Sequence, residues 1–132
     1  MTAKNKVAYA GLKTIWVLII LALTATSCSS SPGKTFGSPI DEKKGTFVTL
    51  AQIYADPAKY EGNNIILEAE AGLICQASGC WVMLTDGSHQ ILAQFFSFTV
   101  RPPKGSILRV QGVLKTQNQV PYLATEGLEI IR

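Results

Sequence analysis

The sequence contains a single histidine, His89, among its 132 residues. One imidazole excludes the H-E-x-x-H zinc motif, and no Ser-His-Asp set can be placed around it. A glycine-rich phosphate-binding loop is also absent from the sequence. Glu68 and Glu70 alternate with apolar residues, which indicates a solvated strand face rather than a catalytic pair of carboxylates. The sequence therefore predicts a protein that is not an enzyme, with His89 in a turn.

The main apolar run of the chain is too short to cross a membrane. Residues 14–26 are uncharged, but these 13 residues fall short of the roughly 20 that a membrane-spanning helix needs. Three lysines and no acid precede the run, and small residues follow it. This order of a basic start, a short apolar centre and small residues is typical of an export signal. We therefore expect residues 1–27 to be a signal peptide.

Cysteine is scarce, and the first of the three cysteines follows the small residues directly. Residues 25–28 read Ala-Thr-Ser-Cys and resemble a bacterial lipobox, with Ala25 where leucine is usual. The resemblance implies that Cys28 becomes the acylated first residue of the mature chain, carrying palmitate-type chains that anchor it to a lipid bilayer. Ser29 then implies the outer membrane, facing the periplasm, if the source is Gram-negative. The alternative is ordinary signal cleavage with Cys28 as a free thiol.

The net charge of +3 belongs to the predicted signal peptide. The chain has 12 Lys and Arg against 9 Asp and Glu, and three of the lysines lie before residue 14. The predicted mature chain is therefore neutral. Its basic residues form no cluster with aromatic residues, so we expect no nucleic-acid partner. The dispersed basic residues of the domain are Lys59, Arg101, Lys104, Arg109 and Lys115.

Residues 28–44 are rich in serine, glycine, proline and charge, and contain few bulky apolar side chains. Such a segment buries too little apolar surface to offset the entropy of ordering it. We therefore expect an acylated cysteine followed by a flexible linker over residues 28–44. The folded domain is expected over residues 45–132.

The domain pattern predicts a mainly β fold with a short leading helix. Thr49 is a suitable N-cap for a helix over residues 50–55, which the Asp56-Pro57 step ends or restarts. Five segments then alternate apolar and polar residues, as strands do: residues 65–75, 80–84, 91–95, 107–115 and 120–131. In this pattern Leu73 and Cys75 face the core, and Gln111 faces outward.

Closing five strands into a small barrel removes the exposed sheet edges, so we expect a five-stranded OB-like barrel. Gly72 and Gly112 fit the positions at which the strands must bend to close it. A two-sheet β-sandwich is the alternative, although five strands are few for that architecture.

Three motifs resemble those of an uncharacterised family of bacterial exported lipoproteins with a small OB-like domain. Residues 74–87, ICQASGCWVMLTDG, carry the C-x4-G-C-W block, and residues 96–103, FSFTVRPP, match the phenylalanine-rich approach to a proline. An Asp-Pro-x-x-Tyr-x-Gly string at residues 56–62 precedes the first strand. The resemblance covers Phe47 to Ile131 and implies the fold and the location. It implies no activity.

Cys75 and Cys80 flank a four-residue turn, so we expect them to be cross-strand neighbours that form a disulfide. Closing so short a loop stabilises a domain by about 2 kcal/mol. One alternative is a copper or zinc site that uses Cys75, Cys80 and His89. Another is a thiol-exchange site. The disulfide interpretation requires no cofactor.

Strand parity places Trp81, Met83 and Leu92 on the outward face of the second and third strands. In OB folds this face is the usual ligand platform, unless the helix or the 96–106 loop covers it. The sequence therefore predicts a membrane-anchored binding module of the cell envelope, whose partner is an envelope protein or a small ligand. The alternative is a metal-handling or thiol-redox accessory protein that uses Cys75 and Cys80.

Overall fold

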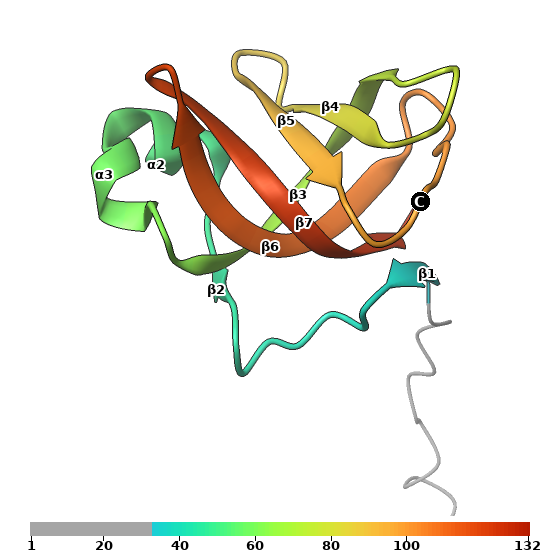
Figure 1. The fold of residues 1–132 in the computed structure, drawn as a ribbon, viewed down its shortest axis with the longest axis horizontal. Coiled ribbons are helices and arrows are strands. Elements are labelled where there is room, and N and C mark those ends of the chain that lie inside the picture. Colours follow the sequence, from blue (N-terminus) through green and yellow to red (C-terminus); the bar gives the residue numbers. More distant parts are fainter. Residues whose placement is uncertain (1–32) are drawn as a thin grey trace, which may run out of the picture. The chain divides into compact units, whose positions relative to one another are not determined.

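Five strands close into a barrel in the computed structural model, which describes residues 33–132 (Figure 1). The barrel strands are β3 (Asn64–Ile74), β4 (Trp81–Thr85), β5 (Gln90–Phe95), β6 (Ile107–Gln117) and β7 (Val120–Ile130). Antiparallel pairing joins β3 to β4, β4 to β5, β6 to β7 and β6 to β3, and parallel pairing joins β5 to β7. The pairing returns to its starting strand, which confirms the predicted OB-like barrel.

The two glycines that were expected to bend strands both lie at irregular positions of the barrel. The register of β3 against β4 shifts between Ala71 and Ile74, around Gly72. The register of β6 against β7 shifts at Gly112, where an added Cβ would collide with the backbone of β7. The bulge in β3 also reverses the expected parity, because Leu73 is 68% exposed while Ile74 packs against the core. The inward position predicted for Leu73 is therefore wrong.

Two short helices, α2 (Leu50–Ala55) and α3 (Pro57–Tyr60), precede the barrel and lie at one end of it (Figure 1). Thr49 caps α2 as predicted: its hydroxyl accepts from the backbone N–H of Gln52 at 3.2 Å, and its own N–H donates to the Gln52 side chain at 2.9 Å. Leu50 and Ile53 of α2 are buried in the core. Over residues 33–132, no helix is long and apolar enough to cross a membrane.

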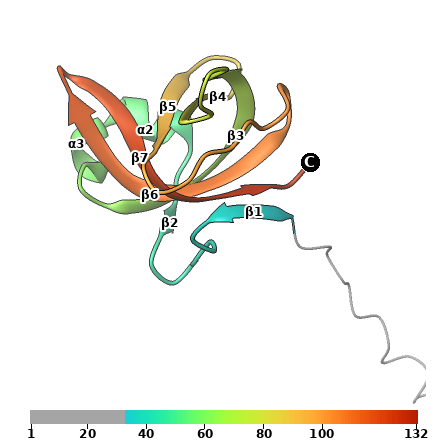
Figure 2. The same cartoon turned by 45° about the vertical axis from the view of Figure 1, so that its right-hand side comes forward.

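The segment before the helices lies on the barrel, where a flexible linker was expected. Strand β1 (Lys34–Gly37) pairs antiparallel with the end of β7 (Figure 2), and β2 (Thr46–Phe47) pairs in parallel with β3. Between them, the Gln111 amide bonds the backbone N–H and C=O of Asp41 at 2.6 and 2.9 Å. Gln111 alternates with the core residue Val110 and so keeps the predicted outward parity, but it is only 4% exposed because the segment around Asp41 and Gly45 covers it.

The prediction of a flexible linker is accordingly wrong for residues 33–44. Backbone pairing with β7 and hydrogen bonds to the buried Gln111 amide offset the entropy cost of ordering this segment, although it contains few apolar side chains. The predicted signal peptide (residues 1–27), Cys28 and the rest of the expected linker lie outside the described residues.

The core is formed by the inward faces of the five barrel strands and by α2. The predicted inward residues of β4 and β5 are buried, which confirms the alternation in both strands. Completely buried side chains come from all five strands and include Leu67, Val82, Leu84, Ala93, Leu108, Val110 and Leu123. Their outward neighbours on β4 and β5 therefore remain available for the surface described next.

Candidate functional site

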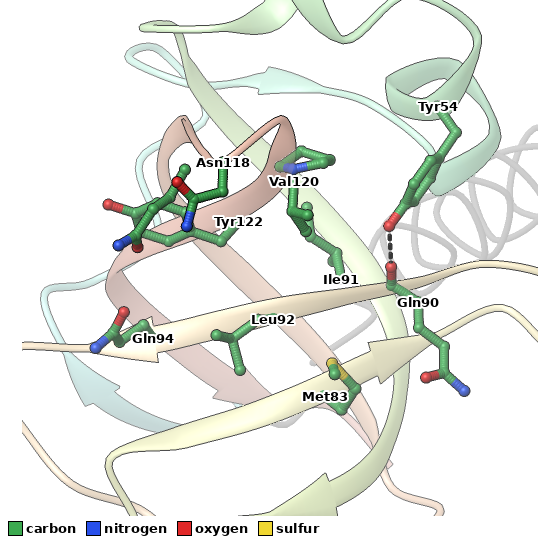
Figure 3. A pocket seen from close by; sticks show the side chains of 11 residues that line it. Tyr54, Met83, Gln90, Ile91, Leu92, Gln94, Asn118, Val120 and Tyr122 are labelled. Atoms are coloured by element: carbon green, nitrogen blue, oxygen red, sulfur yellow. Dashed lines mark hydrogen bonds between the residues drawn. The ribbon is translucent and has the colours of Figure 1, made fainter.

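A pocket of about 420 Å³ lies on the outward face of β4 and β5 (Figure 3). The β6–β7 hairpin borders one side of the pocket, and α2 contributes a single tyrosine, Tyr54. The volume lies within the range of sites that bind small molecules. The lining residues are Tyr54, Met83, Gln90, Ile91, Leu92, Gln94, Gln117, Asn118, Val120, Pro121 and Tyr122.

Strand register brings three of these side chains into one row. Met83 of β4 lies directly opposite Leu92 of β5, and Leu92 is in turn the register partner of Tyr122 of β7. The row crosses three strands, of which β5 is antiparallel to β4 and parallel to β7. It forms an apolar surface that is fixed by backbone hydrogen bonds on both sides of β5.

The tip of the β6–β7 hairpin contributes polar groups from the opposite side. Asn118 lines the pocket from the tip (Figure 3), and both tip residues, Asn118 and Gln119, have positive φ angles of 51° and 66°. Two such residues in a two-residue loop are typical of a type I′ hairpin turn. Asparagine tolerates this conformation better than glutamine does, so Gln119 holds a strained backbone next to the pocket.

Tyr54 borders the pocket and is held by two contacts. Its hydroxyl donates to the backbone carbonyl of Gln90 (Figure 3), and its ring stacks on His89 with centroids 5.4 Å apart. His89 lies in the turn after β4, as predicted, and its Nδ1 is 3.1 Å from the carboxylate of Asp86. The backbone N–H groups of His89 and Ser88 bond the Asp86 carboxylate and hold the pKa of Asp86 below its ordinary value.

The described lining of the pocket carries no charged side chain and no histidine. Its polar groups are the side-chain amides of three glutamines and one asparagine together with two phenols. Amides donate and accept hydrogen bonds equally well, and an ionic ligand would lose its hydration there without gaining a charged partner. The arrangement suits an uncharged ligand that has both apolar surfaces and hydrogen-bonding groups.

The structure unites part of the predicted ligand face. Met83 and Leu92 meet in the pocket, while Trp81 pairs with Gln94 one step along the same face but does not line the pocket. Trp81 is half-buried. The outward parity of Gln90 and Gln94 could have been recognised from the alternation of β5, as that of Leu92 was. Tyr54 and Tyr122 could not, because α2 and the parallel β5–β7 pairing bring them in from distant parts of the sequence.

The Cys75–Cys80 turn connects β3 to β4. Ala71 pairs with Leu84, a register that would continue to Cys75 opposite Cys80. The bulge shifts the strand by one residue, and the N–H of Cys75 donates to the carbonyl of Trp81 at 3.1 Å instead. Cys75 and Cys80 are therefore offset by one residue across the two strands instead of directly opposed, and the bulge at Gly72 is the reason.

Cys75 and Cys80 are both partly exposed free thiols in this structure. The Cys75 sulfur lies 3.3 Å from the Ser78 hydroxyl oxygen. Hydrogen bonds from that hydroxyl, from the backbone N–H groups of Ser78 and Cys80 and from the Cys80 thiol lower the pKa of Cys75 to about 6. The predicted disulfide is not present here and stays a prediction.

The alternative metal set of Cys75, Cys80 and His89 is not assembled. His89 stacks on Tyr54 and bonds Asp86, away from the cysteines. In the part of the chain that the structure describes, no three His, Cys, Asp or Glu side chains converge on a common point. The predicted strand-face acid Glu68 pairs with Arg109 at 2.6 Å, with both side chains partly exposed.

No protein-family model matches this chain, and no curated protein matches it either. Among solved structures, one similar chain is assigned as an aspartyl-tRNA synthetase from Leishmania major Friedlin, with a TM-score of 0.50 and 12% identity. The match covers 72% of this chain and 23% of the synthetase chain. Another is the hypothetical protein ygiW from E. coli, with a TM-score of 0.48, 14% identity and coverage of 72% and 96%. At this identity the first match supports the fold alone.

Proposed function

We propose that this protein is a lipid-anchored binding module of the bacterial cell envelope that holds an uncharged ligand on the outward face of β4 and β5. One observation carries the proposal: the pocket there combines an apolar row of side chains with amides and phenols, and its described lining bears no charge. These two strands are the second and third of the barrel, whose outward face is the common ligand surface of OB folds.

The chemistry of the lining narrows the ligand class. Met83, Leu92 and Tyr122 offer apolar contact, while Gln94 and Asn118 offer amides on either side of them. Acetamido sugars and peptide segments with neutral side chains present matching amide groups and apolar faces. A charged ligand of similar size loses hydration free energy without a compensating partner. We therefore assign the site to uncharged amide-bearing ligands.

The anchoring half of the proposal depends on Cys28. Processed and acylated at this residue, the chain would carry its pocket at the bilayer surface. The Cys28→Ser variant should lose acylation and move from the membrane fraction to the soluble fraction of an exporting bacterial host. Fractionation followed by mass spectrometry of the mature N-terminus measures both changes. A variant that stays in the membrane fraction would contradict anchoring through Cys28.

Binding can be tested with a single built-in probe, because the chain has only two methionines, Met1 and Met83. Met1 belongs to the predicted signal peptide, so methyl-labelled methionine reports on Met83 in the mature chain. We expect the tetramer of N-acetylglucosamine, or a capped neutral peptide, to shift the Met83 methyl NMR signal. The deacetylated tetramer has the same length but is cationic, and it should not shift the signal. Failure of both uncharged probes at millimolar concentration would reject the proposed ligand class.

A further inference from the structure

The turn between β3 and β4 surrounds one sulfur atom with hydrogen-bond donors. The Ser78 hydroxyl oxygen is 3.3 Å from the Cys75 sulfur. The backbone N–H groups of Ser78 and Cys80 and the Cys80 thiol act with this hydroxyl to lower the pKa of Cys75. Both cysteines are partly exposed, so an external reagent can approach them.

Contacts from the 96–106 loop hold this turn in place. The Arg101 guanidinium donates to the carbonyls of Gln76 and Ala77 at 3.1 and 2.8 Å. The N–H of Val100 donates to the carbonyl of Gly79 at 2.9 Å. Gly79 has a φ of +63°, and an added Cβ would approach the Val100 carbonyl within 2.9 Å. The donors around Cys75 are therefore positioned before any reaction takes place.

We propose that Cys75 and Cys80 form an exchangeable dithiol–disulfide pair, in which Cys75 attacks the disulfide of another molecule and Cys80 resolves the product. This inference goes beyond the proposed binding function and uses a different surface. The thiolate of Cys75 displaces one sulfur of the external disulfide as a thiolate and forms a mixed disulfide with the other. The thiolate of Cys80 then attacks the Cys75 sulfur and releases the second external thiolate. Two protein thiols are oxidised, and one external disulfide is reduced to two thiolates, which take up, through solvent, the two protons that the protein thiols release.

The donor arrangement explains why such a disulfide exchanges instead of serving as a permanent crosslink. Hydrogen bonds to a thiolate stabilise the reduced state, because a disulfide sulfur carries no charge and accepts hydrogen bonds weakly. The pKa of Cys75, lowered to about 6 by Ser78 and Cys80, makes Cys75 the attacking sulfur near neutral pH. The titratable and charged groups in contact with the turn are Cys80 and Arg101.

The test uses the full chain, reduced and then exposed to oxidised glutathione. Acid quenching and tandem mass spectrometry locate glutathione on each cysteine separately, Cys28 included. We expect the Cys80→Ser variant to accumulate the mixed disulfide on Cys75, and the wild-type chain to proceed to the Cys75–Cys80 disulfide. A second arm offers the disulfides of insulin, and the ratio of the two rates shows whether small-molecule or protein disulfides react better.

Equilibration in glutathione buffers supplies a readout that does not remove a cysteine. At pH 7 the Ser78→Ala variant should shift the equilibrium toward the disulfide by up to about fivefold, as expected if it raises the pKa of Cys75 from about 6 by up to one unit. Ser88→Ala, a serine in the next exposed turn, is the matched control and should leave the equilibrium unchanged. Thermal denaturation confirms that both variants are folded.

Three results would overturn the proposal. The first is a Cys75–Cys80 disulfide that persists in the folded chain in a large excess of reduced glutathione, which would make it a permanent crosslink. The second is a mixed disulfide that forms on Cys80 as readily as on Cys75. The third is a stoichiometric metal ion on the purified chain that blocks alkylation of both thiols. If the Ser78→Ala variant had the same dithiol–disulfide equilibrium as the wild-type chain, the donors of the turn would have no role, and the proposal would lose its basis.

Discussion

The pocket and the Cys75–Cys80 turn adjoin the same strand but are built in different ways. Met83 of β4 lines the pocket, and the turn ends where β4 begins at Trp81. The pocket is formed by side chains that regular strand pairing places in a row, and its described lining is uncharged. The turn is formed by backbone N–H groups and a hydroxyl around a titratable sulfur. Regular strand pairing shapes the pocket, whereas irregular backbone places donors around the Cys75 sulfur, on which the proposed thiol exchange depends.

This difference predicts that the two regions respond independently to local changes. Both, however, depend on the closed barrel, since the pocket needs the β5–β7 pairing and the turn needs the loop that leads into β6. Substitutions can separate the effect of barrel closure, which both regions need, from the effects of contacts that belong to the pocket or to the turn alone.

The strongest change removes barrel closure, on which both regions depend. A side chain at Gly112 would collide with the backbone of Ala124 in β7. We expect Gly112→Val to lower the free energy of unfolding by about 3 kcal/mol or more, because backbone clashes in a core are poorly relieved. Urea denaturation measures the loss. Gly62→Asn is the control, since nothing lies within 4 Å of an added Cβ there. Equal losses in the two variants would refute the role of Gly112.

A charge in the pocket should strongly weaken ligand binding without affecting the Cys75–Cys80 turn. Leu92→Glu places a carboxylate in the centre of the apolar row, and we expect the affinity for the N-acetylglucosamine tetramer to fall about 100-fold. Leu73→Glu is the matched control, because Leu73 is an exposed leucine outside the pocket. Calorimetric titration gives the affinities. Reduced binding in the control would indicate that the charge acts through the whole domain.

Loosening the Cys75–Cys80 turn should lower the reactivity of Cys75 and leave ligand binding in the pocket unchanged. Arg101→Gln removes the guanidinium bonds to two turn carbonyls, and we expect a loss of about 1–2 kcal/mol in unfolding free energy. Alkylation of Cys75 near pH 7 should slow, while binding in the pocket stays unchanged. Lys104→Gln, which removes a positive charge from the same loop, should alter neither. Alkylation rates measured by mass spectrometry decide between these outcomes.

Relieving backbone strain at the hairpin tip should give a small gain. Gln119 has a positive φ of 66° but does not line the pocket, so Gln119→Gly should stabilise the domain by about 0.5–1 kcal/mol and leave binding intact. Asn118→Gly should gain less, because asparagine tolerates this conformation, and it should weaken binding because Asn118 lines the pocket. Melting temperatures and calorimetric titration provide the two measurements.

The smallest effect concerns pH. The folded pKa of Asp86 lies below its ordinary value because the carboxylate accepts N–H bonds within the 86–89 turn. The stabilisation is therefore present above the unfolded pKa of about 3.9 and is lost as pH falls through the lower folded pKa. Amide NMR signals of Ser88 and His89 should titrate with a midpoint below the ordinary value. A midpoint at or above it would show that these bonds do not form.

Much of the fold could be predicted from the alternation of apolar residues. The barrel, the cap at Thr49 and the bends at Gly72 and Gly112 all follow from local patterns, and all are present. Local patterns cannot count the residues in a bulge, so the parity predicted for Leu73 was wrong and the one-residue offset between Cys75 and Cys80 could not be predicted. They also cannot show that residues 33–44 pair with β7 and bury Gln111, because those contacts join distant parts of the chain.

The candidate site, like the fold, could be predicted only where it depends on local patterns. Alternation alone placed Met83 and Leu92 on one outward face, and they meet in the pocket. Tyr54 and Tyr122 arrive through tertiary contacts that no local pattern encodes. The role of Ser78 depends on turn geometry, for which the sequence offers only the spacing between Cys75 and Cys80.

The most direct test measures the Met83 methyl signal under two separate treatments. Adding the N-acetylglucosamine tetramer should shift the signal, since Met83 lines the pocket. Converting the Cys75–Cys80 pair between dithiol and disulfide should leave the signal in place. This result would show that an uncharged ligand occupies the pocket and that the two regions act independently. A signal that ignores every uncharged ligand and follows the thiol state would contradict the account.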